Sequence, residues 1–242
     1  GSFARLAEET AKAILAAGGE VRTNAPVTRP ERRGADWVAQ GPWGQVAGSA
    51  VIATPAPALV ADMLEPAGQA TPDDLAMLRR IPYLANICLV LELDRALGST
   101  YWTNVNDPGF PYVGVIEHTN FENAASYGGR HIVYLSKYLP ETDALYRMTD
   151  DQVLQFSVPH LQRMFPAFRR DWVQRFHVWR APWAQPVVER HYSTLIPPLQ
   201  GLLPGLYLAS MAQIYPEDRG TNHAVREGRR IAALVRDGAA HG

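Results

Sequence analysis

The pattern of apolar residues is helical near both ends of the sequence. Near the start, apolar and small residues fall on one helical face, and Gly18-Gly19 supplies the glycine stop expected after the last turn. This first predicted face consists of Phe3, Leu6, Ala7, Thr10, Ile14 and Leu15. A final amphipathic helix is predicted from the same spacing of Ala224, Val225, Gly228, Ile231, Ala232 and Val235.

Short extended pieces, separated by glycine and proline, follow the first helix. The pattern predicts strands at 20–23, 26–28, 36–40 and 49–53, with a turn at 41–44. Two short helices are expected next. One covers 58–64, and the other runs to Arg80 behind Thr71, which is a preferred N-cap residue followed by proline and two aspartates.

The middle of the chain changes to longer runs of aromatic and β-branched residues. Strands are predicted at 84–93, 112–117, 131–138, 173–180 and 205–210, with a proline-marked stretch at 181–198. Thr149 and Gln152 form a capping box for a helix reaching about Met164, and Pro159 is expected to kink or break that helix. The resulting fold class is α/β (α+β), with a second sheet rich in antiparallel strands.

Composition and charge narrow the classes of function. The 242 residues are 47% hydrophobic, and 23 basic residues nearly balance 24 acidic ones, which gives no reason to expect nucleic acid or an anionic membrane as a partner. Cys88 is the only cysteine, and the histidines lack metal-ligand spacing, so no disulfide or metal site is expected. No apolar stretch is long enough for a membrane helix, and we expect a cytoplasmic protein.

The segment 205–232 is the most informative motif, because it reads as a buried strand, a loop and a helix start. Free amides and the positive helix end suit an anion or a polar ring, although strand-loop-helix units are common and a purely structural role stays open. The segment resembles the C-terminal flavin-binding signature of the FAD-dependent amine oxidase and protoporphyrinogen oxidase superfamily. Ala224 and Gly228 match its paired small residues, whereas Ser210-Met211 stands where the family has Gly-Asp.

Two other segments resemble the same superfamily in order and spacing. The opening match comprises Gly1-Ser2-Phe3, Leu6-Ala7, Gly18-Gly19, Val27 and the run from Val51 to Pro55. The segment 179–186, with its tryptophans and prolines, resembles the part of the family that approaches the flavin ring. The resemblance therefore covers nearly the whole chain, with a loosely matched middle third.

The resemblance implies FAD as cofactor and a discontinuous fold. Residues 1–76 and 200–242 are expected to form part of a Rossmann-like FAD-binding domain, and 77–199 a substrate domain. The expected cofactor contacts are Val27, Ala53, Ser210, Met211, Arg219, Gly220, Thr221 and Asn222. Candidate contacts to a small-molecule substrate are Trp102, Asn104, His118, Asn120, Arg180, Trp183 and Tyr215. No catalytic residue is identified.

Such flavoproteins begin with a strand, Gly-x-Gly-x-x-Gly and a helix, a motif that this sequence lacks. We therefore expect a C-terminal fragment that needs an N-terminal FAD-binding segment as partner and is inactive and nearly colourless alone. The expected reaction of the parent is oxidation of an organic substrate by hydride transfer to flavin. The alternatives are a flavin-dependent nucleotide-sugar mutase, in which Arg130 and Arg180 bind a diphosphate, and a noncatalytic binding domain.

Overall fold

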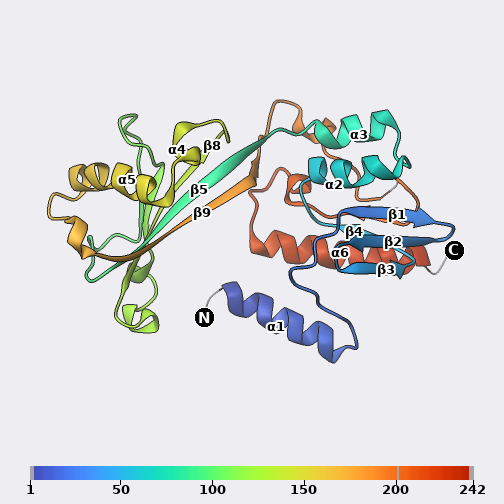
Figure 1. The fold of residues 1–242 in the computed structure, drawn as a ribbon, viewed down its shortest axis with the longest axis horizontal. Helices are drawn as coiled ribbons and strands as arrows, with labels where there is room; N and C mark the ends of the chain where they lie inside the picture. Colours follow the sequence, from blue (N-terminus) through green and yellow to red (C-terminus); the bar gives the residue numbers. More distant parts are fainter. Residues whose placement is uncertain (1–2, 201, 240–242) are drawn as a thin grey trace. The chain divides into compact units, whose positions relative to one another are not determined.

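The protein is described by a computed structural model that covers residues 3–200 and 202–239. Gly1 and Ser2, the first two residues of the opening match, lie outside the described residues. The chain forms two compact units, each with its own core (Figure 1). Unit 1 combines the residues up to Arg80 with those from Ser193 onwards, and unit 2 is the continuous segment Ile81–Tyr192.

Unit 1 mixes helices with two small sheets. Its elements in chain order are α1 (Phe3–Ala16), β1 (Arg29–Arg33), β2 (Asp36–Gly41), β3 (Gly44–Gly48), β4 (Val51–Ala53), α2 (Pro57–Leu64), the 3₁₀ helix η1 (Glu65–Ala67), α3 (Pro72–Arg79), β10 (Leu206–Leu208), the 3₁₀ helix η6 (Met211–Gln213) and α6 (Thr221–Ala239). The predicted N-terminus of α3 is confirmed, because Thr71 and Asp74 form a reciprocal capping box.

Strands β1, β2 and β3 form an antiparallel meander. Arg33 pairs with Asp36 across a tight turn at Gly34, whose φ of +67° is the left-handed conformation that glycine adopts without strain. The predicted strands at 20–23 and 26–28 are wrong, because those residues lie outside the sheet. The charged sequence Arg-Pro-Glu-Arg-Arg becomes the first strand instead, since a hairpin partner rather than hydrophobicity determines its pairing.

Strands β4 and β10 pair in parallel, with Val51 opposite Leu206 and Ala53 opposite Leu208. The early and the late parts of the chain therefore contact each other through this pair. The core beneath it contains Trp37, Val60, Ala61, Leu64, Leu78, Leu206 and Leu208. This core therefore fixes the positions of the carboxyl ends of β4 and β10 relative to the helices of unit 1.

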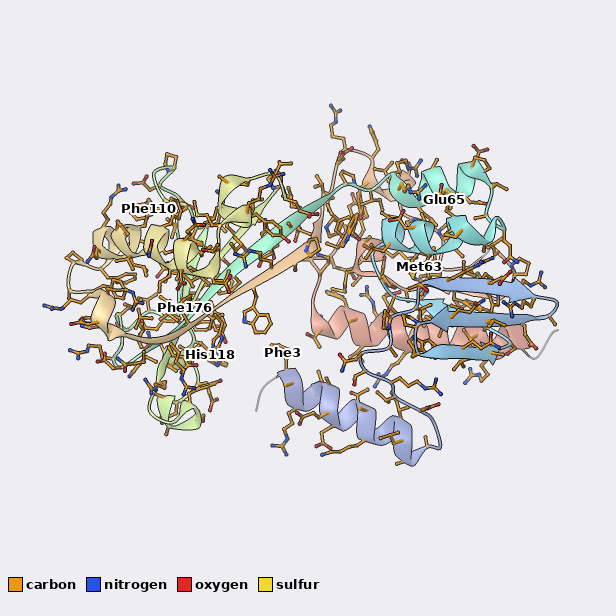
Figure 2. The ribbon with its side chains drawn as sticks, in the orientation of Figure 1. Phe3, Met63, Glu65, Phe110, His118 and Phe176 are labelled. Atoms are coloured by element: carbon orange, nitrogen blue, oxygen red, sulfur yellow. The ribbon has the colours of Figure 1, made fainter. Side chains whose placement is uncertain are left out.

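The amphipathic helix predicted at the start is present as α1, but none of its residues is buried. Its apolar side chains remain at the surface, and Figure 2 shows that of Phe3, which is 79% exposed, projecting from the first turn. The final amphipathic helix α6 differs, because Ile231 is only 3% exposed. The two ends of the sequence thus share a pattern and differ in burial.

Unit 2 is a five-stranded sheet with short helices. Its elements are β5 (Tyr83–Leu93), β6 (Trp102–Asn104), β7 (Gly114–Glu117), the 3₁₀ helices η2 (His118–Asn120) and η3 (Ala124–Tyr127), β8 (His131–Leu139), α4 (Ala144–Arg147), α5 (Asp150–Met164), the 3₁₀ helix η4 (Arg170–Trp172) and β9 (Val173–Pro186). The sheet order is β6-β7-β8-β5-β9 with all neighbours antiparallel, and β5 and β9 run side by side in Figure 1. The predicted mixed fold with an antiparallel-rich sheet is confirmed.

The two faces of this sheet differ, because side chains alternate along each strand. Ile87, Leu89 and Leu91 point into the core with Val153 and Leu161 of α5. The opposite face consists of half-buried or exposed side chains, namely Asn86, Cys88, Val90 and Glu92 of β5, Tyr134 and Ser136 of β8, Ile116 of β7, Trp102 and Asn104 of β6 and His177 and Trp179 of β9.

Two expectations about proline need correction. The predicted capping box of Thr149 and Gln152 opens α5, but the helix continues through Pro159 to Met164 without a break. Pro159 and Gln155 are both exposed, so water can bind the carbonyl that the missing N–H leaves free. Strand β9 was predicted to end at Arg180, before the proline-marked stretch, but it continues through Pro182 to Pro186 because an edge strand tolerates proline.

Candidate functional site

A cavity of about 300 Å³ opens in unit 1 where β4 and β10 end beside α6. Ile52 and Thr54 line it from β4 and its exit, and Ala209, Ser210, Met211 and Ile214 follow β10. The helix contributes Ala224, Glu227, Gly228 and Ile231. The carboxyl ends of two parallel strands are where open α/β sheets bind ligands, so this cavity is the first candidate site.

Ser210 is a polar residue of this cavity whose buried side chain lacks an internal partner. Its backbone N–H donates to Gln213 Oε1 at 2.7 Å, and its carbonyl accepts from the Gln213 N–H at 3.1 Å, which fixes the turn into η6. The side chain is only 8% exposed, and its Oγ has no hydrogen-bond partner. A buried hydroxyl without a partner lowers stability, so this hydroxyl is available to bind a ligand.

One helical stripe forms the other wall of the cavity. Ala224, Glu227, Gly228 and Ile231 follow the spacing i, i+3, i+4 and i+7, which places them on one face of α6. A Cβ built on Gly228 meets no atom within 4 Å, so this glycine leaves open space. The stripe therefore combines small residues with a single carboxylate.

The start of α6 lies just beyond the cavity lining. Gly220 accepts a hydrogen bond from Ala224 N at 3.0 Å, so it caps the helix, and the amides of Thr221 and Asn222 have no partner inside the helix. Arg226 bridges the preceding loop by pairing with Glu217 at 2.7 Å. This hydrogen-bonded guanidinium lowers the pKa of the Glu217 carboxyl.

The predicted cofactor residues fall into three groups in the structure. Ser210 and Met211 line the cavity, and Ala53 lies between its lining residues Ile52 and Thr54, with its carbonyl bound to Ala209 N at 2.9 Å. A second group forms the loop and helix start outside the lining, namely Arg219, Gly220, Thr221 and Asn222. Val27 is 38% exposed in the irregular segment before β1 and does not line the cavity.

Three of the substrate candidates belong to the open sheet face of unit 2. The Trp102 indole N–H donates to Asn104 Oδ1 at 2.8 Å. His118, labelled in Figure 2, is 2.6 Å from the Tyr127 hydroxyl through Nε2, and its ring meets Tyr134 edge to face. This face therefore carries aromatic rings together with hydrogen-bonding side chains.

The remaining substrate candidates are placed elsewhere. The Asn120 amide donates to the carbonyls of Gly98 and Thr100, which holds the loop before β6. Arg180 lies on the helix-covered face, where all three guanidinium nitrogens donate to Tyr146, Met148 and Asp150. Trp183 packs edge to face on Tyr83, and Tyr215 belongs to unit 1.

Besides Ser210 and Met211, the lining contains residues that sequence reasoning did not assign to the site, among them Ala209, Ile214 and Glu227, whereas Ile52 and Thr54 fall within the matched run Val51–Pro55. Ala224 and Gly228 were recognised only as a sequence pattern. The signal for Glu227 was available, because any residue three positions after Ala224 on a helix shares its face. Ile214 could not be found in this way, since its position depends on the turn made by η6.

Within residues 3–200 and 202–239, no three histidine, cysteine or carboxylate side chains are arranged to bind a metal together. No helix in this described part of the chain is both long and apolar enough to cross a membrane.

The sequence matches the family of flavin-containing amine oxidoreductases over residues 2–236. The chain belongs to this family. No curated protein matches the sequence.

Solved structures of this family share the fold at low sequence identity. A protein from Exiguobacterium sp. 255-15 assigned as a protoporphyrinogen oxidase aligns with a TM-score of 0.69 and 14% identity, over 90% of this chain and 48% of its own. An oxidoreductase from Methanosarcina mazei gives 0.67 and 17%, over 93% and 52%. Cyclohexylamine oxidase from Brevibacterium oxydans IH-35A gives 0.69 and 13%, over 99% and 53%. The chain thus spans about half the length of these structures.

Proposed function

We propose that this chain is part of an FAD-dependent oxidoreductase that oxidises a small organic molecule by hydride transfer to the flavin. In this proposal unit 1 is part of the FAD-binding domain and unit 2 is the substrate domain. The observation that carries it is the cavity between β4, β10 and α6, in a chain that belongs to a flavin-containing family. A cavity at the ends of parallel strands suits a nucleotide cofactor.

The residues present fit such a cofactor. The unpartnered hydroxyl of Ser210 is available to a ligand, and the open space at Gly228 lets one approach the backbone of α6. Ser210, Met211 and the amides of Gly220, Thr221 and Asn222 are the groups that we assign to holding the flavin portion. FAD, when bound, supplies the hydride acceptor, and the protein supplies orientation and donors for the negative charge of the reduced ring.

The substrate side of the proposal uses the open sheet face of unit 2. Trp102, Tyr134 and Trp179 offer aromatic surface, and Asn104 and His118 offer polar contacts at its edge. Oxidation of an amine, alcohol or C–H bond by this route transfers a hydride from a substrate carbon to the flavin, which requires the substrate to be held in a fixed orientation. Trp183 and Tyr215 stay further substrate candidates.

The alternative as a nucleotide-sugar mutase requires arginines that are free to bind a diphosphate. Arg180 was one of the two candidates, and its guanidinium already binds two carbonyls and a carboxylate. If Arg180 bound a diphosphate instead, the turn between α4 and α5 would lose these hydrogen bonds. The oxidoreductase is therefore the function that we propose, and Arg130 alone supports the isomerase.

We also propose that a segment carrying the glycine-rich dinucleotide motif completes unit 1. Among the described residues β4 has β10 as its only strand neighbour, which leaves the other edge of β4 unpaired. The chain also lacks the sequence that holds the pyrophosphate. We expect this chain alone to bind FAD weakly and the longer protein to bind it stoichiometrically.

The test is flavin content, measured from the absorbance spectrum of the purified longer protein. Gly228→Val fills the open space on α6 and should abolish flavin binding, whereas Gly48→Val in β3 is the matched control and should retain it. A colourless wild-type longer protein would contradict the proposal and leave a noncatalytic binding domain. Anaerobic bleaching by an organic substrate would separate oxidation from isomerisation.

A further inference from the structure

His118 and Tyr127 form a hydrogen-bonded pair beside the open sheet face of unit 2. The Nε2 atom of His118 lies 2.6 Å from the Tyr127 hydroxyl, and the two rings meet edge to face. The His118 ring also meets the ring of Tyr134 edge to face, with 6.0 Å between the centroids. Two phenols thus fix the plane of the imidazole, and one of its nitrogen atoms is already engaged.

The second ring nitrogen of His118, Nδ1, is available to a ligand. It has no hydrogen-bond partner among the described residues. It is not enclosed either, whereas the Nδ1 atoms of His131 and His160 are buried without a partner. The imidazole therefore has one nitrogen held by the protein and one that is accessible.

The loop that carries the pair is held by hydrogen bonds at both ends. Thr119 Oγ1 accepts from Ile132 N at 3.1 Å, which ties η2 to β8. Asn123 Oδ1 accepts from Ala125 N at 2.9 Å and starts η3, and Gly128 ends η3 with a φ of +63°. Because these bonds fix the backbone around both rings, the pair keeps one geometry, as a reacting side chain requires.

The other titratable groups of the open face are less suited to take up a proton. Burial raises the pKa of the Cys88 thiol to about 11 and also raises the pKa of the Tyr134 hydroxyl, so both stay protonated at neutral pH. His177 is 53% exposed, and its Nε2 lies 3.6 Å from the carboxylate of Glu92. His118 combines an accessible nitrogen with a fixed orientation between two phenols.

Oxidation by hydride transfer leaves a proton to be removed. When a carbon that bears an amine or hydroxyl group loses hydride to the flavin, the electron pair of the N–H or O–H bond forms the C=N or C=O bond. The proton of that bond must go to an acceptor. A neutral imidazole accepts it at Nδ1 when its own proton is on Nε2 and is donated to the Tyr127 oxygen. The same oxygen then stabilises the positive charge that the imidazole gains.

We propose that His118 is a catalytic residue that removes the proton from an amine or hydroxyl group of the substrate, and that Tyr127 is the positioning residue that keeps Nδ1 of His118 free to accept it. This role rests on the proposed function and narrows its substrate class to molecules whose reacting carbon bears an N–H or O–H group. The titratable groups in contact with His118 are Tyr127 from η3 and Tyr134 from β8, and no charged side chain among the described residues is bonded to it.

The first test is the tautomer of His118 in the 242-residue chain. Nitrogen chemical shifts of isotope-labelled histidine distinguish the two tautomers at about pH 8.5, where an ordinary imidazole is neutral. The signals of His118 are those that disappear in His118→Gln. We expect the proton on Nε2 in the wild type and a mixture of both tautomers in Tyr127→Phe. A proton on Nδ1 in the wild type would overturn the proposal, because no acceptor would be left for the substrate.

The second test is the rate of anaerobic flavin bleaching in the longer protein, with benzylamine and benzyl alcohol as probes. Each has an aromatic ring and an N–H or O–H group on a carbon that can lose hydride. His118→Gln keeps a hydrogen-bonding group near the position of Nε2 but takes up no proton, so we expect bleaching to be about 100- to 10,000-fold slower. His160→Gln changes a histidine of α5, which packs on the other face of the sheet, and should keep the wild-type rate. His118→Asn gives the same comparison should the glutamine variant fail to fold.

The dependence of the rate on pH separates proton transfer from a structural role. The hydroxyl of benzyl alcohol does not titrate between about pH 5 and about pH 8, and an imidazole that is already protonated accepts no further proton. The wild-type rate with benzyl alcohol should therefore fall as the pH is lowered, and the residual rate of His118→Gln should not. Tyr127→Phe should bleach about ten times more slowly, with an unchanged dissociation constant for the probe.

A wild-type rate in His118→Gln would overturn the proposal, and so would a flavin-loaded protein that neither probe bleaches. Failure of the proposed function is detected separately, as a lack of flavin in the longer protein.

Discussion

The indole N–H of Trp37 donates a 2.9 Å hydrogen bond to the carbonyl of Pro204, across 167 positions of the sequence. Trp37 is 1% exposed and belongs to the core of unit 1. Trp37→Phe removes the donor and leaves a smaller ring in the core. We expect the free energy of unfolding to fall by about 1–3 kcal/mol, measured by urea denaturation.

Trp43 is the matched control for this prediction. Its indole N–H makes the same kind of bond, at 2.8 Å to the carbonyl of Pro26, but on the surface of the unit. Trp43→Phe should lower the free energy of unfolding by less than about 1 kcal/mol, because water replaces the lost bond. Equal effects of the two substitutions would contradict the expectation that the buried Trp37 stabilises the fold more than the exposed Trp43 does.

Gly205 precedes β10 with a φ of +79°, and an added Cβ would lie 2.9 Å from Trp37 Nε1 and 3.1 Å from the carbonyl oxygen of Ser49. Gly205→Ala combines backbone strain with this crowding, so we expect the free energy of unfolding to fall by about 2–4 kcal/mol. Gly34 has a φ of +67° and open space around an added Cβ. Gly34→Ala should therefore lower the free energy of unfolding by only about 1 kcal/mol. Thermal melts of both variants measure the difference, and similar melting points would contradict the crowding.

Much of the architecture followed from local sequence signals. Thr71 and Thr149 mark helix starts because their side chains satisfy backbone amides within three residues, a rule that needs no tertiary structure. Strand β1 was missed because its charged residues become a strand only through the partner β2. Pro159 does not break its helix, because Gln155, whose carbonyl loses its helical donor, is exposed to water.

Glu117 holds the loop after β5 through its buried carboxylate. Its two oxygens accept from Leu97 N at 2.8 Å and Gly98 N at 3.0 Å, and the residue is 3% exposed. Glu117→Gln replaces one acceptor by an amide that faces a donor, so we expect a loss of about 1.5–3 kcal/mol in urea denaturation. Glu122→Gln, which affects one exposed bond from Ser126, should change stability by less than about 0.5 kcal/mol.

Cys88 should react slowly with thiol reagents in the folded chain. Burial raises the pKa of its thiol to about 11, so the reactive thiolate forms only well above neutral pH. At pH 8 we expect the native chain to react with a disulfide reagent at least about ten times more slowly than the chain unfolded in urea. Equal rates in the two states would mean that the thiol is accessible on the open sheet face.

The candidate site was only partly accessible from sequence. Family resemblance located Ser210 and Met211, because they follow the last strand directly. The wall formed by Thr54 and Glu227 requires β4 to pair with β10, a contact between distant segments that periodicity does not encode. Arg180 was a substrate candidate because of its charge. Its three hydrogen bonds depend on the positions of α4 and α5, which the sequence does not show.

The parallel pairing of β4 with β10 also determines the order in which the chain can fold during synthesis on the ribosome. Residues 81–192 form a continuous unit, so they can fold as soon as they emerge. The β4 segment emerges earlier, but its strand partner among the described residues, Leu206–Leu208, is translated only after unit 2. The parallel pair of unit 1 can therefore form only after the whole of unit 2 has been translated, and until then the side of β4 that pairs with β10 stays open.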